Sequence, residues 1–187
     1  MKKSIFMAGL AALIFAGCGP EDKVEKRVIL FPNRHLKAEW AIKRAVNGDT
    51  LLHGVSREYF KNGDNKSSVV WKNGKKDGPD QAWYEGGITK WQKSFEAGSK
   101  TGTWHLYYKD EHPWMVLNYV NHTLNGAAQA WDENNPDTPR EAVFANGVCV
   151  SGDCGILTVP TLDEKALTPA EKTEMTEARE TLQEFLE

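Results

Sequence analysis

The sequence predicts a mainly β protein in which one extended antiparallel meander of repeated hairpins precedes a C-terminal amphipathic helix. Three observations support this fold class. A glycine recurs every 24 residues, aromatic residues keep the same phase, and glycine-containing turns separate short aromatic and β-branched runs. Such runs joined by tight turns are typical of hairpins. A fixed period indicates that each repeat is one structural unit that stacks on its neighbours.

Residues 1–17 predict an export signal. A basic start precedes an apolar run over residues 5–15, which is too short to cross a hydrocarbon layer of roughly 30 Å as a helix. Small residues then stand before Cys18, and this end resembles the lipobox of bacterial lipoproteins, although Phe15 stands where leucine is usual. The resemblance implies cleavage before Cys18 and acyl chains on that residue, which hold a protein on a membrane. An ordinary cleaved signal with a free cysteine is the alternative.

The same resemblance implies an outer-membrane location if the cell has such a membrane. Gly19 follows the cysteine, where an aspartate would mark retention in the inner membrane. Residues 18–27 are then a tether between the membrane and a repeat domain that we place over residues 28–159.

The charge balance argues against nucleic acid as a partner. Removing residues 1–17 takes two lysines from the 23 basic side chains, which leaves 21 against 26 acidic ones. Residues 161–187 hold eight acids and three bases, so this tail carries the whole acidic excess. No basic field is left to attract a phosphate backbone.

The repeat divides the domain into units over residues 54–77, 78–101, 102–125 and 126–147. The glycines that open the units are Gly54, Gly78, Gly102 and Gly126. The fifth and sixth residues after each glycine are Tyr59-Phe60, Trp83-Tyr84, Tyr107-Tyr108 and Trp131-Asp132. Each unit is predicted to form two strands of about six residues, each followed by a turn.

Glycine-containing pairs mark the turns: Asn62-Gly63, Asn73-Gly74, Gly86-Gly87, Ala97-Gly98 and, in a last hairpin, Asn146-Gly147. In the third unit Glu111 and His122 replace the turn glycines, which leaves the geometry of those turns in doubt. Residues 28–48 resemble a degenerate first unit with strands over 28–31 and 36–46. Residues 33–46 could instead form a helix, and the sequence does not decide between the two.

Cys149 and Cys154 are expected to form a disulfide, because an exported protein is exposed to an oxidising compartment. Closing so short a loop contributes about 2 kcal/mol at most. A redox-active pair is the alternative, although its usual spacing of two residues and its following helix are both absent.

Residues 160–187 are predicted to hold an acidic linker and a helix. Thr168 can cap the helix, Pro169 can occupy its first position, and Glu171 can return a bond to the cap. An apolar stripe follows, made of Met175, Ala178, Leu182 and Phe185. Such a stripe needs a surface to pack on.

At the level of the unit, the sequence resembles the MORN-variant repeats of many bacterial proteins. The shared features are a glycine, an aromatic pair, Asn-Gly, a second strand and a further Asn-Gly, and the stretch Gly102–Tyr108 is the clearest instance. The resemblance covers roughly residues 50–147 and implies a MORN-like sheet. Some members carry an antitoxin label, which implies protein binding. The resemblance therefore indicates architecture better than function.

Adjacent strand residues point to opposite faces, so the aromatic pairs predict one ring row on each face of the sheet. One row can pack under the terminal helix, but about eighteen helical residues reach only about 27 Å, whereas ten strands span nearly 48 Å at about 4.8 Å each. Part of one face should therefore remain exposed as an interaction surface. The residues we expect to bind a ligand are Tyr59, Trp83, Trp91, Trp104, Tyr107 and Trp131.

No arrangement in the sequence indicates catalysis, a metal or a cofactor. His105 and His112 lie on either side of a turn at a spacing that fits no compact metal site. No serine stands in a nucleophile elbow, and no glycine loop precedes a helix to hold phosphate. We expect a lipid-anchored, non-enzymatic envelope protein whose repeats bind another protein. The alternative is a carbohydrate-binding module, because the aromatic repeats also resemble choline- and glucan-binding repeats, whose period is shorter.

Overall fold

The computed structural model describes residues 23–133 and 135–157. The predicted export signal, the lipidation site Cys18 and the C-terminal helix predicted within residues 160–187 lie outside the described residues. The first strand begins at Val24 rather than at residue 28, so the last four residues of the predicted tether belong to the sheet.

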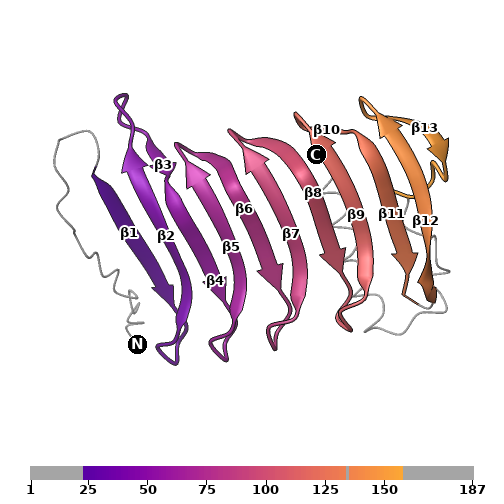
Figure 1. Ribbon diagram of the computed structural model, residues 1–187. Helices are drawn as coiled ribbons and strands as arrows, with labels where there is room; N and C mark the ends of the chain where they lie inside the picture. Colours follow the sequence, from indigo (N-terminus) through magenta and orange to yellow (C-terminus); the bar gives the residue numbers. More distant parts are fainter. Residues whose placement is uncertain (1–22, 134, 158–187) are drawn as a thin grey trace, which may run out of the picture.

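The described residues form one 13-stranded antiparallel sheet in which neighbours along the chain pair with each other, as the sequence predicts (Figure 1). The strands are β1 (Val24–Leu30), β2 (Leu36–Arg44), β3 (Thr50–Leu52), β4 (Gly54–Tyr59), β5 (Asn65–Lys72), β6 (Lys75–Trp83), β7 (Thr89–Glu96), β8 (Ser99–Tyr107), β9 (Pro113–Val120), β10 (Thr123–Leu124), β11 (Gly126–Asp132), β12 (Asn135–Ala145) and β13 (Val148–Gly152). The short strands β3 and β10 pair with β2 and β9, beside β4 and β11.

Each repeat glycine lies at a local break or kink in a strand. Gly54 and Gly126 begin β4 and β11, one residue beyond the short strands β3 and β10, whereas β6 and β8 run through Gly78 and Gly102. All four have positive φ, between 69° and 127°. A side chain at φ +127° is strained, and a Cβ on Gly78 would lie 3.2 Å from the Cβ of Val70. The 24-residue period therefore reflects the positions at which the backbone needs a positive φ.

The turns that join β5 to β6, β7 to β8, β9 to β10 and β12 to β13 share one backbone geometry. Their central pairs all have positive φ, as a type I′ turn requires, and are Asn73-Gly74, Ala97-Gly98, Asn121-His122 and Asn146-Gly147. The second residue of each pair donates its backbone N–H to a carbonyl in the strand that follows the preceding turn. The four acceptors lie 24 residues apart: Leu52, Lys76, Lys100 and Leu124. These bonds tie each unit to the one before it.

The third unit keeps this geometry without its turn glycines. Glu111 has φ 72° and His122 has φ 73°, close to the values of Gly87 and Gly74 in the equivalent turns. The geometry of these turns, which the sequence left in doubt, is therefore that of the other units.

Replacing Glu111 by glycine is expected to stabilise the protein by about 0.5–1 kcal/mol. The left-handed conformation costs a non-glycine residue about 1–2 kcal/mol, and the extra backbone entropy of glycine returns part of that gain to the unfolded chain. Urea denaturation of the mature chain measures the change. Glu85→Gly, in a turn of the preceding unit and at negative φ, is the control and should destabilise the protein; equal shifts in the two variants would contradict the strain.

Residues 36–44 form strand β2, so of the two alternatives that the sequence left open the strand is adopted and the helix over residues 33–46 is not. The strand pairs with β1 on one side and with β3 and β4 on the other. A tight turn at residues 32–35 precedes it, and Phe31 donates its backbone N–H to the His35 carbonyl at 2.8 Å. Pairing on both sides satisfies the backbone groups of this segment and outweighs its local helical periodicity.

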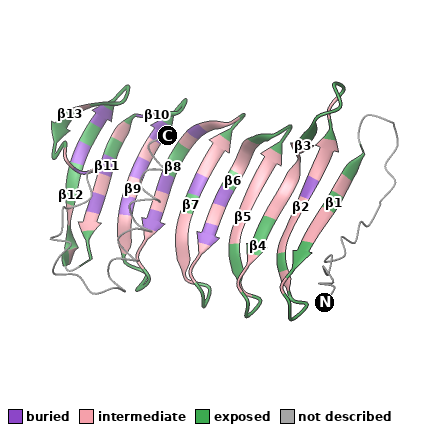
Figure 2. Cartoon of the chain, turned by 180° about the vertical axis from the view of Figure 1, so that it is seen from behind, coloured by how far each residue is buried: buried purple, intermediate pink, exposed green. Residues whose placement is uncertain are grey.

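The hydrophobic core lies against β8–β12 rather than at the centre of the sheet (Figure 2). Its largest fully buried side chains are those of Trp104, Leu106, Leu117 and Ile156. Tyr119 belongs to the same cluster, and burial raises its pKa to about 12. The strands β1–β5 contribute one buried apolar residue, Ala41. The two ends of the sheet therefore differ in how firmly they are packed.

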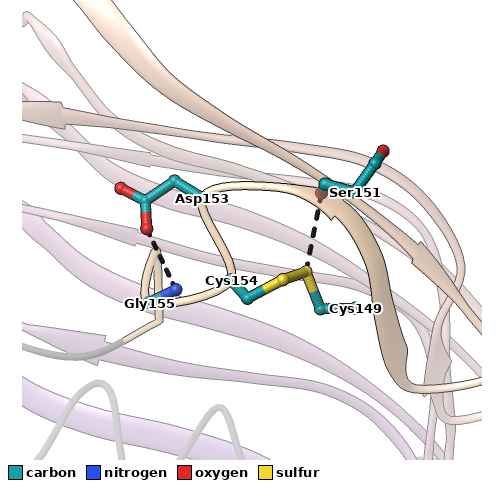
Figure 3. The surroundings of a disulfide bond; sticks show 5 residues. All are labelled: Cys149, Ser151, Asp153, Cys154 and Gly155. Carbon is teal, nitrogen blue, oxygen red and sulfur yellow. Dashed lines mark hydrogen bonds between the residues drawn. A yellow bond between two sulfur atoms is a disulfide. The ribbon is translucent and has the colours of Figure 1, made fainter.

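The predicted disulfide between Cys149 and Cys154 is present, with a distance of 5.6 Å between the Cα atoms (Figure 3). Asp153 inside the loop accepts hydrogen bonds from Arg140 Nε at 2.6 Å and from the Gly155 N–H at 3.0 Å. Its own N–H donates to the Glu141 carbonyl. The loop is thereby fastened to β12, and it delivers Ile156 to the core.

Candidate binding face

The sheet has two unlike faces. Asp80 lies opposite Lys93, Ala82 opposite Trp91, and Trp91 opposite Leu106, so these residues share one face, which we call the core face. In strands β6, β7, β8, β9, β11 and β12, every buried residue lies on the core face. The residues between them in the sequence point to the other side, which we call the open face. Their side chains are half-buried or exposed.

Four aromatic residues form a row across the open face. This ring row consists of Tyr59, Trp83, Tyr107 and Trp131, which lie at or next to the ends of β4, β6, β8 and β11. The pairing register shifts directly beside each of them, so they lie at the same level of the sheet. Because one strand separates each from the next, neighbouring members stand about 10 Å apart. All four are half-buried.

A polar row that the sequence interpretation missed runs beside the ring row. It contains the residues two positions before each ring, which alternation places on the same face: Arg57, Gln81, His105 and Gln129. Gln92 continues it between the second and third, because Gln92 pairs with both Gln81 and His105. The His105 ring stacks on Tyr107 at 6.4 Å between centroids. The four residues could have been found from the sequence, because they share the 24-residue period.

Trp91 and Trp104, which we grouped with the ring row, lie on the core face. Trp104 stands three residues before Tyr107, an odd separation that puts the two rings on opposite sides of β8. Trp91 lies opposite Ala82, the neighbour of Trp83. Trp104 is 1% exposed. The six aromatic residues therefore do not form one surface, and only the four members of the ring row belong to the open face.

In two of the aromatic pairs the second member, Tyr84 or Tyr108, links its unit to the next one. Tyr84 donates its hydroxyl hydrogen to the Tyr107 carbonyl at 3.0 Å, and Tyr108 donates to the Trp131 carbonyl at 2.9 Å. Burial raises the pKa of Tyr108, and the nearby charges of Glu133 and Asp132 raise it further. Both tyrosines follow the last residue of their strands. They therefore fix the backbone from which the next ring of the row projects.

A carboxylate orients the first ring of the row. Glu39 Oε1 accepts hydrogen bonds from the Tyr59 hydroxyl at 2.9 Å and from Arg57 Nη1 at 3.0 Å. Partial burial alone would raise the pKa of Glu39, but these two bonds outweigh it and the pKa is lowered. The pKa of Tyr59 is raised, first by burial and then by its bond to the carboxylate. The ring and the guanidinium are thus held in a fixed geometry.

A shallow hollow lies beside the second ring of the row. It is lined by Trp83, Asp64 and Asn65 and by the turn glycines Gly63 and Gly87. Asp64 Oδ2 accepts a hydrogen bond from the Gly86 N–H at 3.0 Å. An aromatic ring beside a carboxylate and an amide can stack on a flat apolar group while bonding its polar edge.

The two histidines considered as metal ligands lie in different parts of the structure and have different partners. His105 lies in the polar row, whereas His112 pairs with Asp110 at 2.9 Å in the β8–β9 turn. Within residues 23–133 and 135–157, no group of three or more His, Cys, Asp and Glu side chains could hold a metal ion.

The His112–Asp110 pair predicts a pH-dependent turn. The hydrogen bond to Asp110 raises the pKa of His112 above 6.5, and the same bond lowers the pKa of Asp110 below 3.8. Any stability from His112 is therefore complete below 6.5 and is lost as the pH rises through its raised pKa. NMR titration should show this pKa fall in Asp110→Asn. Asp137→Asn, which removes a weaker charge effect, is the control and should lower it less.

Comparisons with known proteins do not assign the chain to a family. No family model matches it, and no curated protein matches it. Among the residues that the structure describes, no helix is long and apolar enough to span a membrane.

Proposed function

We propose that the protein is a non-catalytic envelope scaffold that binds another protein through the open face. The observation that carries this proposal is the unequal use of the two faces: the buried residues of the main strands from β6 to β12 lie on the core face, while the ring row and the polar row lie on the other. Half-exposed aromatic rings flanked by hydrogen-bonding side chains are typical of the centres of protein interfaces. A stacked repeat presents such a surface over a long distance.

The same proposal includes the export and anchoring that the sequence suggests. Residues 1–17 act as a signal peptide, Cys18 is lipidated, and the lipid holds the protein on the outer membrane. The disulfide between Cys149 and Cys154 supports an oxidising compartment, because such bonds persist outside the cytosol. The tether then begins at the membrane and meets the sheet at β1.

The proposal also assigns the units to the MORN-variant repeats and gives the chain a C-terminal amphipathic helix. One antiparallel hairpin for each 24 residues supports the first assignment, since the shared features of that repeat fall at the same turns. The capping residues and apolar stripe of residues 168–185 support the second.

A second candidate is binding of a surface glycan, and the hollow beside Trp83 favours it. Sugar rings stack on aromatic faces while carboxylates and amides bond their hydroxyl groups, and this hollow offers Trp83, Asp64 and Asn65 together. Glycan-array binding by the mature chain, set against purification of an envelope protein on the immobilised chain, separates the two candidates.

Replacing Trp83 and Tyr107 together by alanine is expected to weaken capture of the purified partner about tenfold or more, because hot-spot rings each contribute over 1 kcal/mol. The melting temperature should change little, since both rings are half-exposed. Titration calorimetry measures the affinity.

The matched control for this double variant removes apolar surface outside the ring row. Val120 and Val143, which are 51% and 41% exposed, are replaced together by alanine, and binding should persist. Unchanged affinity in the Trp83 and Tyr107 variant, or loss of binding only together with unfolding, would rule out the ring row as the binding surface.

A further inference from the structure

Positive charge gathers at the end of the sheet that β1 and β2 form, which we call the β1 end. Residues 23–48 carry seven basic and two acidic side chains there. Both acids already pair with arginines, Glu25 with Arg27 at 2.7 Å and Glu39 with Arg57 of β4 at 3.0 Å. Five of the seven basic side chains are exposed, namely Lys23, Lys26, Arg34, Lys37 and Arg44. The β1 end therefore presents a positive surface to the solvent.

The opposite end of the sheet is acidic. Residues 126–157, which hold β11, β12 and β13, carry five acidic side chains and one basic one. The basic one, Arg140, pairs with Asp153 at 2.6 Å. Ten strand spacings, about 48 Å in all, separate β1 from β13 along the main path of the sheet (Figure 1). This separation of charge directs the β1 end toward a negatively charged surface.

The charges of the β1 end surround the edge of the sheet rather than one of its faces. Lys26 and Arg27 are neighbours in β1 and therefore point to opposite faces, while Arg34 precedes β2 and Arg44 ends it. Exposed apolar side chains lie among these charges, and they are Val24, Ile29, Leu30 and Val46. The last of them is 93% exposed, in the turn after β2. Basic side chains combined with exposed apolar ones are typical of surfaces that bind the interface of anionic membranes.

The proposed tether would keep the β1 end close to a membrane. Val24 follows Cys18 by six residues, and a fully extended chain of that length spans about 20 Å at most. Residues 18–22 add two acids to those of β1 and β2, so residues 18–48 as a whole still carry seven bases against four acids. A layer of anionic headgroups is therefore the negatively charged surface nearest to this end.

We infer that the β1 end binds the anionic phospholipid headgroups of the membrane, so that the sheet extends away from it. The basic side chains contact the phosphate groups, and the exposed apolar side chains enter the boundary between headgroups and acyl chains. The ring row then rises from the membrane, with Tyr59 two strand spacings and Trp131 eight spacings from β1, at about 10 and 38 Å. The inference goes beyond the proposed function, because it concerns neither the partner of the open face nor the acyl chains on Cys18.

Flotation with lipid vesicles tests this binding in a chain that has no acyl anchor. The mature chain with Cys18→Ser is mixed with vesicles of phosphatidylglycerol and phosphatidylcholine in equal amounts, or with vesicles of phosphatidylcholine alone. We expect it to float with the anionic vesicles at low salt and to be released at high salt, because salt screens the headgroup charges. It should not float with the neutral vesicles. Equal binding to both kinds of vesicle, or binding to neither, would overturn the inference.

Two matched triple variants locate the binding surface. The first removes three exposed charges from the β1 end, with Lys26→Gln, Lys37→Gln and Arg44→Gln. The second removes the same charge at exposed positions three or more strand spacings from β1, with Lys72→Gln, Lys75→Gln and Lys109→Gln. The first should weaken vesicle binding about tenfold or more, because each basic residue near an anionic surface contributes severalfold. The second should change binding little, and equal losses in the two variants would overturn the assignment to the β1 end.

Self-association is the competing use of the β1 end, because the acidic β13 end of a second copy would also attract it. Sedimentation velocity of the Cys18→Ser chain without vesicles measures this association, and we expect a monomer. An oligomer that the first triple variant abolishes would show that a second copy covers the β1 end, and it would overturn the inference. Neither measurement contains a protein partner, so their outcome does not depend on whether the open face binds one.

Discussion

Trp104→Ala is expected to lower the free energy of unfolding by about 3–5 kcal/mol, the usual cost of removing a buried tryptophan. The side chain is 1% exposed, and its ring lies 4.5 Å from that of Tyr119 and 5.1 Å from that of Phe95. Its Nε1 donates to the carbonyl oxygens of Ser94 and Thr101, at 3.1 and 3.2 Å. The variant therefore loses the packing of the ring, and the carbonyl groups of Ser94 in β7 and Thr101 in β8 lose the donor that they share. Urea denaturation followed by circular dichroism measures the effect.

Trp83→Ala is the control for Trp104→Ala, because it removes the same side chain from the other face. Trp83 is half-exposed in the ring row, so its replacement should cost about 1 kcal/mol or less. Comparable losses in the two variants would mean that both faces serve as packing, which would remove the structural basis of an open face.

Gly78→Ala is expected to have the second largest effect. A φ of +127° is unfavourable for any residue with a side chain, which costs about 1–3 kcal/mol. The new Cβ would also lie 3.2 Å from the Cβ of Val70, and overpacking of this kind costs about 1–3 kcal/mol more. Both penalties fall at the kink of β6, where the register with β5 shifts while Gly78 stays paired with Phe95 of β7. Denaturant titration of the variant gives the sum.

Gly63→Ala separates the two penalties of the Gly78 variant. Gly63 also has positive φ, at +96°, but nothing lies within 4 Å of a Cβ built there. Its replacement should cost only the backbone strain. If Gly63→Ala destabilises the protein as much as Gly78→Ala, close packing of neighbouring strands does not explain why the repeat places a glycine at the kink.

The period of the turns could be predicted because the positions that need a positive φ are occupied by glycine, which is visible in the sequence. Gly54, Gly78, Gly102 and Gly126 repeat at 24 residues and all have positive φ. The positive φ of Glu111 and His122 could not be predicted in this way. The pairing of the flanking strands imposes the turn geometry there although neither residue is a glycine. The single antiparallel sheet followed from the turns, whereas the strand over residues 36–44 depended on neighbours that local propensity does not describe.

The candidate site was predicted only in part. The ring row was recognised from its period, but Trp91 and Trp104 were grouped with it by proximity in sequence rather than by the alternation of side chains along a strand. The β-bulges beside the ring row shift the register by one residue, so faces can be assigned reliably only once the pairing is known. The buried charges of Lys93 and Lys100 had no sequence signal, because lysine is ordinarily exposed.

Pulsed electron paramagnetic resonance on spin-labelled turns tests the central claim that equivalent turns stack in a line. Labels replace Lys61, Lys109 and Glu133 in pairs, in a chain whose Cys18 is replaced by serine. Four strand spacings separate the first pair and six separate Lys61 from Glu133, so distances of about 19 and 29 Å are expected. Two equal distances, or a longer pair closer than the shorter one, would contradict an extended sheet of repeated hairpins.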